Sequence, residues 1–436
     1  MLLRTPTRAR VVLVSAAIPT QKFTSEKQFP TLTVKTQQAV KILTVVGARP
    51  NFMKAAPIIR ALRAHNAAGR TPRFQHLLVH TGQHYDAIMS DRFFADLELP
   101  EPDLHLGVGS GSHAEQTAEI LRKFEEALRQ EQPDVVIVVG DVNSTLACAL
   151  AVAKFSANTS KRRPLLAHVE AGLRSFDREM PEEVNRVLTD HMADLLFVTE
   201  ESGITNLRHE GIPASKVLFV GNTMIDSLLR FREKAQASSI LQNLGLRETQ
   251  NGLSGSPKNY ALLTLHRPSN VDALESFRDI LEGLSDLTRQ IPVIFPVHPR
   301  TRRRIEEFGL QEYFSAPSPS SGIRLIDPLG YVDFVGIMQD ARLVLTDSGG
   351  IQEETTCLGV PCVTLRENTE RPVTVKRGTN VIGGTSSAGI RQAIAHQLAR
   401  TVTPCVPEMW DGKAAERIVA RLTHLVESES PVPVSE

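Results

Sequence analysis

Three carboxylates at the ends of apolar segments are the first candidates for chemistry in this sequence. Asp141 and Glu170 each follow a run of apolar residues, and Glu182 stands at the predicted start of a helix. A carboxylate beside a buried strand is costly unless it is paired or used, and carboxylates are common general acids and bases. For Glu170 the alternative is an ion pair with Arg174 or Arg178. For the other two carboxylates the alternative is a stabilising position at a helix N-terminus.

The segment 341–354 has the pattern of a phosphate-binding site. Leu343–Leu345 predicts a buried strand, the turn Ser348–Gly350 follows it, and the next residues predict a helix. Glycines let the backbone approach a ligand closely, and the first N–H groups of a helix point at that ligand. The turn is too short for a P-loop and lacks the Lys-Ser/Thr end of one. The pair Glu353-Glu354 favours a nucleotide, because a carboxylate there can hold ribose hydroxyls. The alternative is an ordinary strand–helix turn.

Five basic residues are candidates for contacts with such a phosphate, namely Arg49, Lys54, His266, His298 and Arg371. Arg49 lies in the first predicted strand–helix loop, where the alternative is a surface charge. His266 ends a predicted strand, where the alternative is a hydrogen bond to the backbone. No His or Cys cluster has zinc-ligand spacing and no Asp-rich loop suggests magnesium, so we predict no metal site. No G-x-G-x-x-G motif follows the first predicted strand, so the sequence gives little support for a dinucleotide cofactor.

Composition argues against several classes of protein. A length of 436 residues suggests two or three domains, and a hydrophobic fraction of 41% is sufficient for their cores. Basic and acidic residues number 49 each, which argues against nucleic acid as the main partner. No apolar run approaches the roughly 18 residues of a membrane span. The four cysteines form no C-x-x-C pair, so we expect reduced packing residues and a cytoplasmic protein.

Apolar segments alternate with helical patterns, and this alternation predicts an α/β protein with parallel sheets. The predicted strands are Lys41–Val46, Phe74–His80, Asp134–Val139, Leu165–Val169, Asp194–Val198 and Val217–Val220, then Tyr260–Leu265, Pro292–Val297, Ile323–Ile326, Leu343–Leu345, Cys362–Leu365 and Asn380–Ile382. Predicted helices include Phe52–His65, Ala114–Gln130, Leu146–Phe155 (capped by residues 143–145), 183–193, Ala388–Leu398 and Lys413–Val426, whereas 245–258 is predicted to be a loop. Ligands bind at the carboxyl ends of such strands, so a site is expected from Arg49, Gln83, Asp141, Glu170 and Asn222.

Seven short motifs in this order resemble the bacterial non-hydrolysing UDP-N-acetylglucosamine 2-epimerases over about Lys41–Gly383. They are Gly-Ala-Arg-Pro-Asn-Phe-Met-Lys (47–54), Thr-Gly-Gln-His-Tyr-Asp (81–86), Gly-Asp-Val-Asn-Ser-Thr (140–145), His-Val-Glu-Ala-Gly-Leu-Arg (168–174), Met-Pro-Glu-Glu-Val-Asn-Arg (180–186), Thr-Asp-Ser-Gly-Gly-Ile-Gln-Glu-Glu (346–354) and Thr-Glu-Arg-Pro (369–372). The resemblance implies the GT-B architecture, in which two Rossmann-like doubly wound domains face each other across a cleft. It also implies a final helix that crosses back to the first domain.

The same resemblance implies how a UDP-sugar would be held. Asp141, Glu170 and Glu182 match the catalytic carboxylates of the family, and we add His266 to this group. The second domain would hold UDP, and the first would contribute basic side chains. The expected contacts with UDP or the sugar are Arg49, Lys54, Gln83, Arg178, Asn222, His298, Phe334, Ser348, Gly349, Gly350, Glu354 and Arg371. No cofactor, nucleic acid or membrane is expected, and the chain is expected to form a homodimer.

The expected domain limits are 41–225 for the first domain, 226–408 for the second and 409–428 for the crossing helix. Residues 1–40 are predicted to be a disordered extension, with a signal peptide as the alternative, and 429–436 a flexible tail. The expected reaction is inversion at C2 of UDP-N-acetylglucosamine through loss and re-addition of UDP. The alternatives are an epimerase of a related sugar such as UDP-2,3-diacetamido-2,3-dideoxy-glucuronate, a hydrolysing form, a GT-B glycosyltransferase, and a non-enzymatic UDP-sugar sensor.

Overall fold

A computed structural model describes residues 39–83, 93–156, 163–250, 253–314, 321–400 and 405–427. The predictions for residues 1–38, for His84–Asp86 and for the tail 429–436 lie outside the described residues. Within the described part of the chain, no helix combines the length and the apolar character that a membrane span requires.

The first sheet has seven strands in the order β3-β2-β1-β4-β5-β6-β7, and every pairing in it is parallel. Its strands are β1 (Val40–Val46), β2 (Phe74–His80), β3 (Leu104–His105), β4 (Val135–Val139), β5 (Leu165–Ala171), β6 (Leu195–Val198) and β7 (Val217–Phe219). The helices and the short 3-10 turn along this part of the chain are α1 (Arg49–Ala67), α3 (His113–Glu131), α4 (Asn143–Lys154), α5 (Pro181–Met192), α6 (Glu201–His209), η1 (Ala214–Lys216) and α7 (Thr223–Gln236).

The second sheet has six parallel strands in the order β12-β11-β10-β13-β14-β15. They are β10 (Ala261–Thr264), β11 (Val293–Pro296), β12 (Ile323–Ile326), β13 (Leu343–Thr346), β14 (Cys362–Thr364) and β15 (Asn380–Ile382). The helices along the rest of the chain are α8 (Ile240–Asn243), α9 (Pro268–Val271), α10 (Leu274–Gly283), α11 (Ser285–Gln290), α12 (Pro299–Glu307), η2 (Gln311–Phe314), α13 (Tyr331–Gln339), α14 (Gly349–Leu358), α15 (Pro372–Lys376), α16 (Ser387–Ala399) and α17 (Ala414–Glu427).

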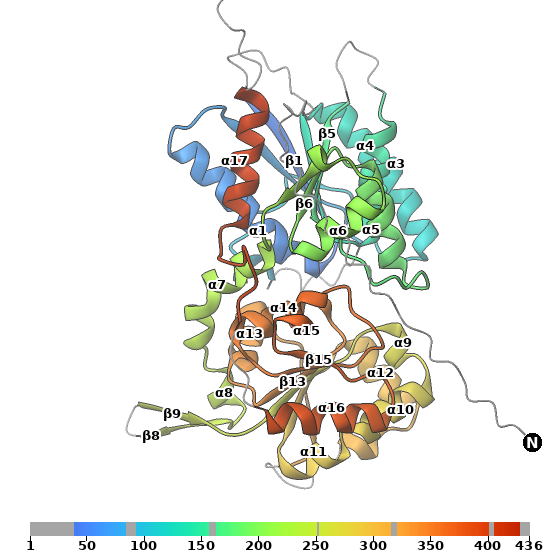
Figure 1. Cartoon of the computed structure of the whole chain (residues 1–436), viewed down its shortest axis with the longest axis vertical. Helices are drawn as coiled ribbons and strands as arrows, with labels where there is room; N and C mark the ends of the chain where they lie inside the picture. Colours follow the sequence, from blue (N-terminus) through green and yellow to red (C-terminus); the bar gives the residue numbers. More distant parts are fainter. Residues whose placement is uncertain are drawn as a thin grey trace, which may run out of the picture.

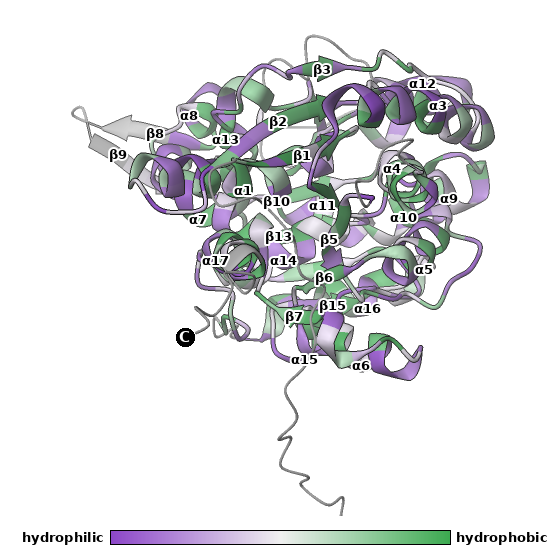
Figure 2. Cartoon of the chain, turned by 90° about the horizontal axis from the view of Figure 1, so that it is seen from above, coloured by the Kyte–Doolittle hydropathy of each residue, from purple (hydrophilic) through white to green (hydrophobic). Residues whose placement is uncertain are grey.

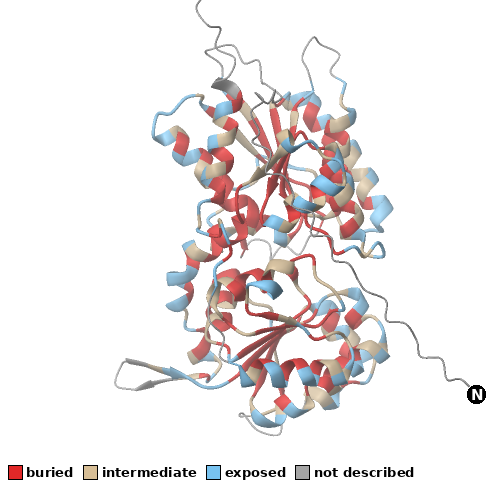
Figure 3. Ribbon diagram, in the orientation of Figure 1, coloured by how far each residue is buried: buried red, intermediate tan, exposed pale blue. Residues whose placement is uncertain are grey.

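The central strands of both sheets are buried on two faces, which Figure 3 shows as red strands in the middle of each half. In β1, Ile42 packs toward one hydrophobic cluster while Leu43 and Val45 pack toward another. This alternation follows from the two-residue period of a strand, and helices on both faces explain the nearly continuous apolar composition of β4. Viewed from above in Figure 2, apolar strands lie between helices with polar outer faces.

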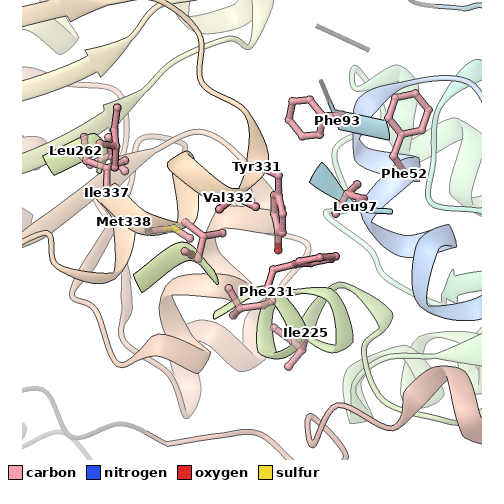
Figure 4. Close-up of a cluster of buried hydrophobic side chains, with 14 of the residues drawn as sticks. Phe52, Phe93, Leu97, Ile225, Phe231, Leu262, Tyr331, Val332, Ile337 and Met338 are labelled. Atoms are coloured by element: carbon pink, nitrogen blue, oxygen red, sulfur yellow. The ribbon is translucent and has the colours of Figure 1, made fainter. Parts of the chain in front are cut away.

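Helix α7 and the cluster around it join the two halves of the molecule (Figure 1). One continuous hydrophobic cluster includes Phe52 of α1, Phe231 of α7 and Tyr331 of α13. Figure 4 shows these side chains together, with Phe231 and Tyr331 in an edge-to-face arrangement at 6.3 Å between ring centroids. Helix α17 packs instead with the strands of the first sheet, through side chains such as Ile418 and Leu422.

The structure confirms the predicted α/β class and the two parallel sheets, and it corrects several element limits. The predicted loop 245–258 contains an antiparallel hairpin, β8 (Arg247–Gln250) with β9 (Leu253–Pro257). Helix α1 begins at Arg49 rather than Phe52, because Pro50 is favourable in the first turn of a helix. Helix α4 begins at Asn143, so residues 143–145 form its first turn instead of capping it.

Candidate active site between the two sheets

The carboxyl ends of the two sheets meet where polar side chains of both halves touch. In each sheet the strand order reverses at one point, between β1 and β4 in the first and between β10 and β13 in the second. Ligands of such sheets bind at these reversal points. The loops there begin at Gly47, Gly140, Leu265 and Asp347, and the motifs singled out in the sequence lie on them.

Glu170 is the central carboxylate of this region. Its backbone has φ of +77°, a conformation that L-residues other than Gly rarely adopt, where the pairing of β5 with β6 is irregular. The buried carboxylate pairs with Lys54 of α1 through one oxygen and with Arg371 of the other half through the second. Such strain commonly occurs at functional sites, where surrounding contacts maintain it.

The partners of Glu170 differ from the alternative considered in the sequence. Arg174 pairs with Asp190 and Glu210 at 2.7 Å each. Arg178 is exposed in the loop before α5. The correct partners lie far away in the chain, so local sequence could not reveal them.

Asp141 follows Gly140 at the end of β4 and faces the same region. Its carboxylate lies 2.9 Å from the guanidinium of Arg186 on α5, so it forms an ion pair and does not cap α4. Burial would raise the pKa of Asp141, but nearby cations, chiefly Arg186, hold that pKa below its usual value. Gly140 has φ of +68°, and a Cβ there would lie 3.1 Å from Lys54 Nζ, so a side chain would press on the charged pair.

The two acidic residues of the first turn of α5 differ in burial. Glu182 is half-buried. Glu183 is buried, pairs with Arg186, and accepts hydrogen bonds from the backbone N–H groups of Ser175 and Phe176 at 3.0 and 2.9 Å. Glu183 therefore organises the preceding loop and Arg186, which in turn contacts Asp141.

The strand, turn and helix predicted for residues 343–354 are present at the end of β13 in the second sheet. Ser348 is the residue before α14, and Gly349 and Gly350 open the helix. A Cβ at Gly349 would lie 2.4 Å from the carboxylate of Glu370, so a side chain here would displace that buried, ion-paired carboxylate. Arg366 pairs with Glu370 at 2.7 Å, and surrounding arginines, Arg186 first, hold the pKa of Glu370 well below its usual value despite burial.

The loop after β10 is fixed to the loop after β13 by Asp347. The carboxylate of Asp347 accepts the backbone N–H groups of His266 and Arg267 at 2.9 Å each, and its other oxygen lies 2.8 Å from His266 Nδ1. Burial would raise the pKa of Asp347, but His266 and these hydrogen bonds lower it to about 2. The His266 side chain is 57% exposed, which leaves its Nε2 edge toward solvent or a ligand.

The adjacent acidic residues of α14 have different partners. Glu353 lies 2.8 Å from Arg371 Nε, and burial raises its pKa to about 8. Glu354 accepts a hydrogen bond from the hydroxyl of Tyr331 at 2.9 Å, and burial raises its pKa to about 7. Glu354 is therefore bound to Tyr331 of α13.

The remaining predicted residues have contacts outside this ionic cluster. The guanidinium of Arg49 lies 5.7 Å from the ring centre of Phe93. The side-chain oxygen of Gln83 accepts hydrogen bonds from the N–H and hydroxyl of Ser144. Three others have structural contacts that the sequence did not predict: Asn222 caps α7, His298 caps α12, and Phe334 packs against the hydrophobic cluster of Figure 4.

Several charged residues of the site were not predicted from the sequence. They are Glu183, Arg186, Glu370 and Arg366. Most of them lie inside the quoted motifs, which is the only signal the sequence offered. Arg267 and Arg366 also contact the sulfur of Met180 at 3.4 and 3.7 Å, so a side chain from the first half sits between two arginines of the second.

The chain is similar to proteins of one family along most of its length. Residues 66–423 match the family model described as UDP-N-acetylglucosamine 2-epimerase. The chain is 42% identical over 387 residues to the UDP-N-acetylglucosamine 2-epimerase of Methanocaldococcus jannaschii, covering 88% of this chain and 99% of that protein. It is 38% identical to the UDP-2,3-diacetamido-2,3-dideoxy-D-glucuronate 2-epimerase of Pseudomonas aeruginosa, covering 88% and 100% respectively.

Solved structures show the same fold. The crystal structure of the Methanocaldococcus jannaschii UDP-GlcNAc 2-epimerase in complex with UDP-GlcNAc and UDP superimposes with a TM-score of 0.77 at 40% identity, covering 88% of this chain and 100% of that one. The Neisseria meningitidis UDP-GlcNAc 2-epimerase bound to UDP-GlcNAc gives 0.73 at 30% identity, with the same coverage.

Proposed function

Since this chain belongs to the UDP-N-acetylglucosamine 2-epimerase family, we propose that it interconverts UDP-N-acetylglucosamine and UDP-N-acetylmannosamine through elimination and re-addition of UDP. The observation that carries the proposal is Glu170, a buried carboxylate held by Lys54 from one half of the molecule and Arg371 from the other. A base and the cations suited to an anionic leaving group are thus in contact.

The leaving group would be bound by the second half of the molecule. The N-terminus of α14, opened by Gly349, presents free N–H groups and a positive dipole end to the diphosphate. Arg371 and His266 add positive charge beside it. Negative charge develops on UDP as the C1–O bond breaks, so groups placed there in advance lower the barrier.

Departure of UDP makes the proton at C2 removable. The electrons of the C1–O bond leave with UDP, positive charge builds on C1 and the ring oxygen, and a base then takes the C2 proton. The products of this step are 2-acetamidoglucal and UDP. Protonation of C2 from the opposite face and re-addition of UDP at C1 give the epimer, with no net redox change.

Two faces of C2 require two proton-transfer groups, which accounts for several carboxylates instead of one. The candidates are Asp141, Glu170 and Glu182. All three come from the first half of the molecule, opposite the proposed UDP-binding residues at the N-terminus of α14. A carboxylate not engaged with the proton can stabilise the positive charge at C1.

Glu170 must change partners before it can act as a base. Both of its carboxylate oxygens contact cations, one Lys54 and the other Arg371. A bound diphosphate competes for Arg371 and Lys54 because it carries more charge than one carboxylate. Substrate binding would thereby release the base at the moment it is needed.

Epimerisation in D2O tests this proposal. Purified protein incubated with UDP-N-acetylglucosamine should give UDP-N-acetylmannosamine with deuterium at C2, observed by 1H NMR. Product without deuterium at C2 would exclude the elimination route. UDP binding without any exchange would indicate a sensor.

A second candidate substrate is supported by the 38% identity to the glucuronate-sugar epimerase of Pseudomonas aeruginosa. The same elimination chemistry applies to that sugar. Competition between the two UDP-sugars, measured as the ratio of their kcat/KM values, assigns the substrate. The homodimer expected from the sequence also stays a prediction.

A further inference from the structure

A buried histidine on the strand that carries Glu170 contacts the end of the neighbouring strand, just before Asp141. His168 is on β5, and its side chain is fully buried. Its Nδ1 atom lies 2.6 Å from a carboxylate oxygen of Asp190, and its Nε2 atom lies 2.8 Å from the backbone carbonyl of Gly140. Both partners accept hydrogen bonds and cannot donate one. Both ring nitrogens must therefore donate, and a histidine does so only as the imidazolium cation.

The surroundings can hold this buried positive charge. Asp190 also lies 2.7 Å from Arg174, whose guanidinium pairs with Glu210. The cluster thus contains His168, Arg174 and two carboxylates, with His191 at its exposed side, 3.2 Å from Glu210. Buried charges are tolerated when they are paired and hydrogen-bonded in this way.

The contacts of His168 and Asp190 reach both segments that carry the proposed catalytic carboxylates. The carbonyl that His168 holds belongs to Gly140, the residue directly before Asp141. The second oxygen of Asp190 accepts the backbone N–H of Gly172 at 3.0 Å, two residues after Glu170. The strained backbone of Glu170 is thus flanked by His168 on one side and Gly172 on the other, and Asp190 binds both.

We propose that His168 and Asp190 act as a positioning unit for the reaction, with His168 carrying a proton on both ring nitrogens. The unit fixes Asp141 through the Gly140 carbonyl and Glu170 through its flanking residues. Neither residue contacts the substrate. This inference rests on the proposed epimerisation, because the placement it explains is that of the two carboxylates.

Two substitutions separate the contacts of the ring. In His168→Gln the amide nitrogen can take the place of Nε2 and donate to the Gly140 carbonyl, while in His168→Asn it takes the place of Nδ1 and donates only to Asp190. We expect His168→Asn to lower kcat by about 100-fold, since a displacement near 1 Å can have that effect. His168→Gln should retain most of the activity, within about 10-fold of the original. Neither substitution should change KM or the affinity for UDP, because the proposed UDP-binding residues belong to the second sheet and its loops.

His65 provides the matched control. It is buried, and its Nε2 atom contacts the carbonyl of Pro72 at 2.9 Å near the far end of α1. His65→Asn and His65→Gln should leave kcat unchanged. Melting temperatures of all four variants show whether a fall in kcat follows from lost stability alone. Equal kcat for His168→Asn and His168→Gln, or a loss that simply parallels the melting temperature as in the His65 pair, would overturn the proposal.

The protonation state of His168 is tested without any turnover. In 15N-histidine-labelled protein, the signals that disappear in His168→Gln should show two protonated ring nitrogens at neutral pH. An unprotonated ring nitrogen assigned to His168 would overturn the proposal whatever the kcat values of the variants. A positive NMR result in a protein that lacks C2 exchange would mean that the proposed reaction, and not the histidine assignment, is wrong.

Discussion

Glu170, Asp141 and Glu182 differ in their surroundings, and those differences set what each can do. Glu170 contacts two cations across the two halves of the molecule. Asp141 has one close cation, Arg186, and a lowered pKa, so it is ionised at neutral pH. Glu182 is half-buried at a helix N-terminus, where a negative charge is favoured. All three can therefore transfer a proton or stabilise positive charge on a sugar that loses an anionic leaving group.

Replacing each carboxylate by its amide keeps the shape of the side chain and removes its ability to accept a proton. We expect Asp141→Asn, Glu170→Gln and Glu182→Gln each to lower kcat by roughly 10²–10⁴-fold, the usual contribution of a positioned acid or base. UDP affinity, measured by titration calorimetry, should change little. Glu179→Gln is the control, because Glu179 is exposed and lies just before α5, the helix that carries Glu182. Near-normal turnover in all three variants would contradict the assignment.

Glu354 makes stability depend on pH. Burial raises its pKa to about 7, so the folded chain keeps a proton that the unfolded chain releases above pH 4.5. The free energy of unfolding should therefore fall by roughly 3 kcal/mol as pH rises from about 4.5 to about 7, the pKa values of Glu354 in the unfolded and folded chain. Glu354→Gln removes this dependence. Urea unfolding at pH 5 and pH 8 measures this dependence. The free energy of unfolding of Glu354→Gln, relative to that of the original protein, should be higher at pH 8 than at pH 5.

The exposed carboxylate Glu416 provides a control for that experiment. Glu416→Gln should leave the pH dependence of unfolding as it is in the original protein. An identical pH dependence for the original protein and Glu354→Gln would show that Glu354 is already ionised in the folded chain.

Single residues of the site could be predicted where local sequence determines their place. Asp141, Glu170 and Ser348 follow apolar strands, and parallel strands bring such ends to one edge. Their partners could not be predicted, because Lys54 and Glu170 are 116 positions apart and Arg371 and Glu170 are 201 apart. A pairing at that separation depends on how the two sheets are placed, which a single sequence does not encode locally.

At the scale of elements, the regular βα units could be predicted and the irregular ones could not. The strand Phe74–His80 has the predicted limits because its apolar run ends at turn residues. The hairpin of β8 and β9 was predicted as a loop because residues 245–258 are polar and rich in Gly and Ser. No apolar period marks such a hairpin, and none of its side chains with a described burial (Arg247 and 255–257) is buried.

Helix α17 depends on a cap supplied by a different helix. The carboxylate of Asp226 on α7 accepts the N–H groups of Ala414 and Ala415 at 3.1 and 2.8 Å. We expect Asp226→Ala to destabilise the protein by about 1–2 kcal/mol, the range of a lost N-cap. The effect should appear as a lower urea midpoint. Glu416→Ala, exposed in the same first turn, should shift the midpoint by less than about 0.5 kcal/mol. Equal shifts for the two variants would show that the cap does not hold α17 in place.

At the scale of the whole molecule, the two halves are joined in two different ways. The hydrophobic cluster of Figure 4 passes through α7 from α1 to α13 and forms a permanent connection. On the side of the site, the contacts are ionic or sulfur-mediated: Glu170 with Arg371, and Met180 between Arg267 and Arg366. Polar contacts separate more easily than packed apolar ones, so α7 is the expected hinge and the site is the expected opening.

This arrangement predicts that Arg371 controls closure as well as chemistry. Arg371→Met removes the charge that links the halves and leaves Glu170 with Lys54 alone, so the unliganded variant should have a larger radius of gyration in small-angle X-ray scattering. Its turnover should fall by roughly 10²–10³-fold, since a charge-stabilising donor toward UDP is lost. Arg377 is the matched control, because it also faces the first half, 3.9 Å from Glu201, but both side chains are largely exposed. Such an exposed pair contributes little, so Arg377→Met should keep the original radius and activity. An unchanged radius in Arg371→Met would mean that the hydrophobic cluster around α7 alone sets the closed state.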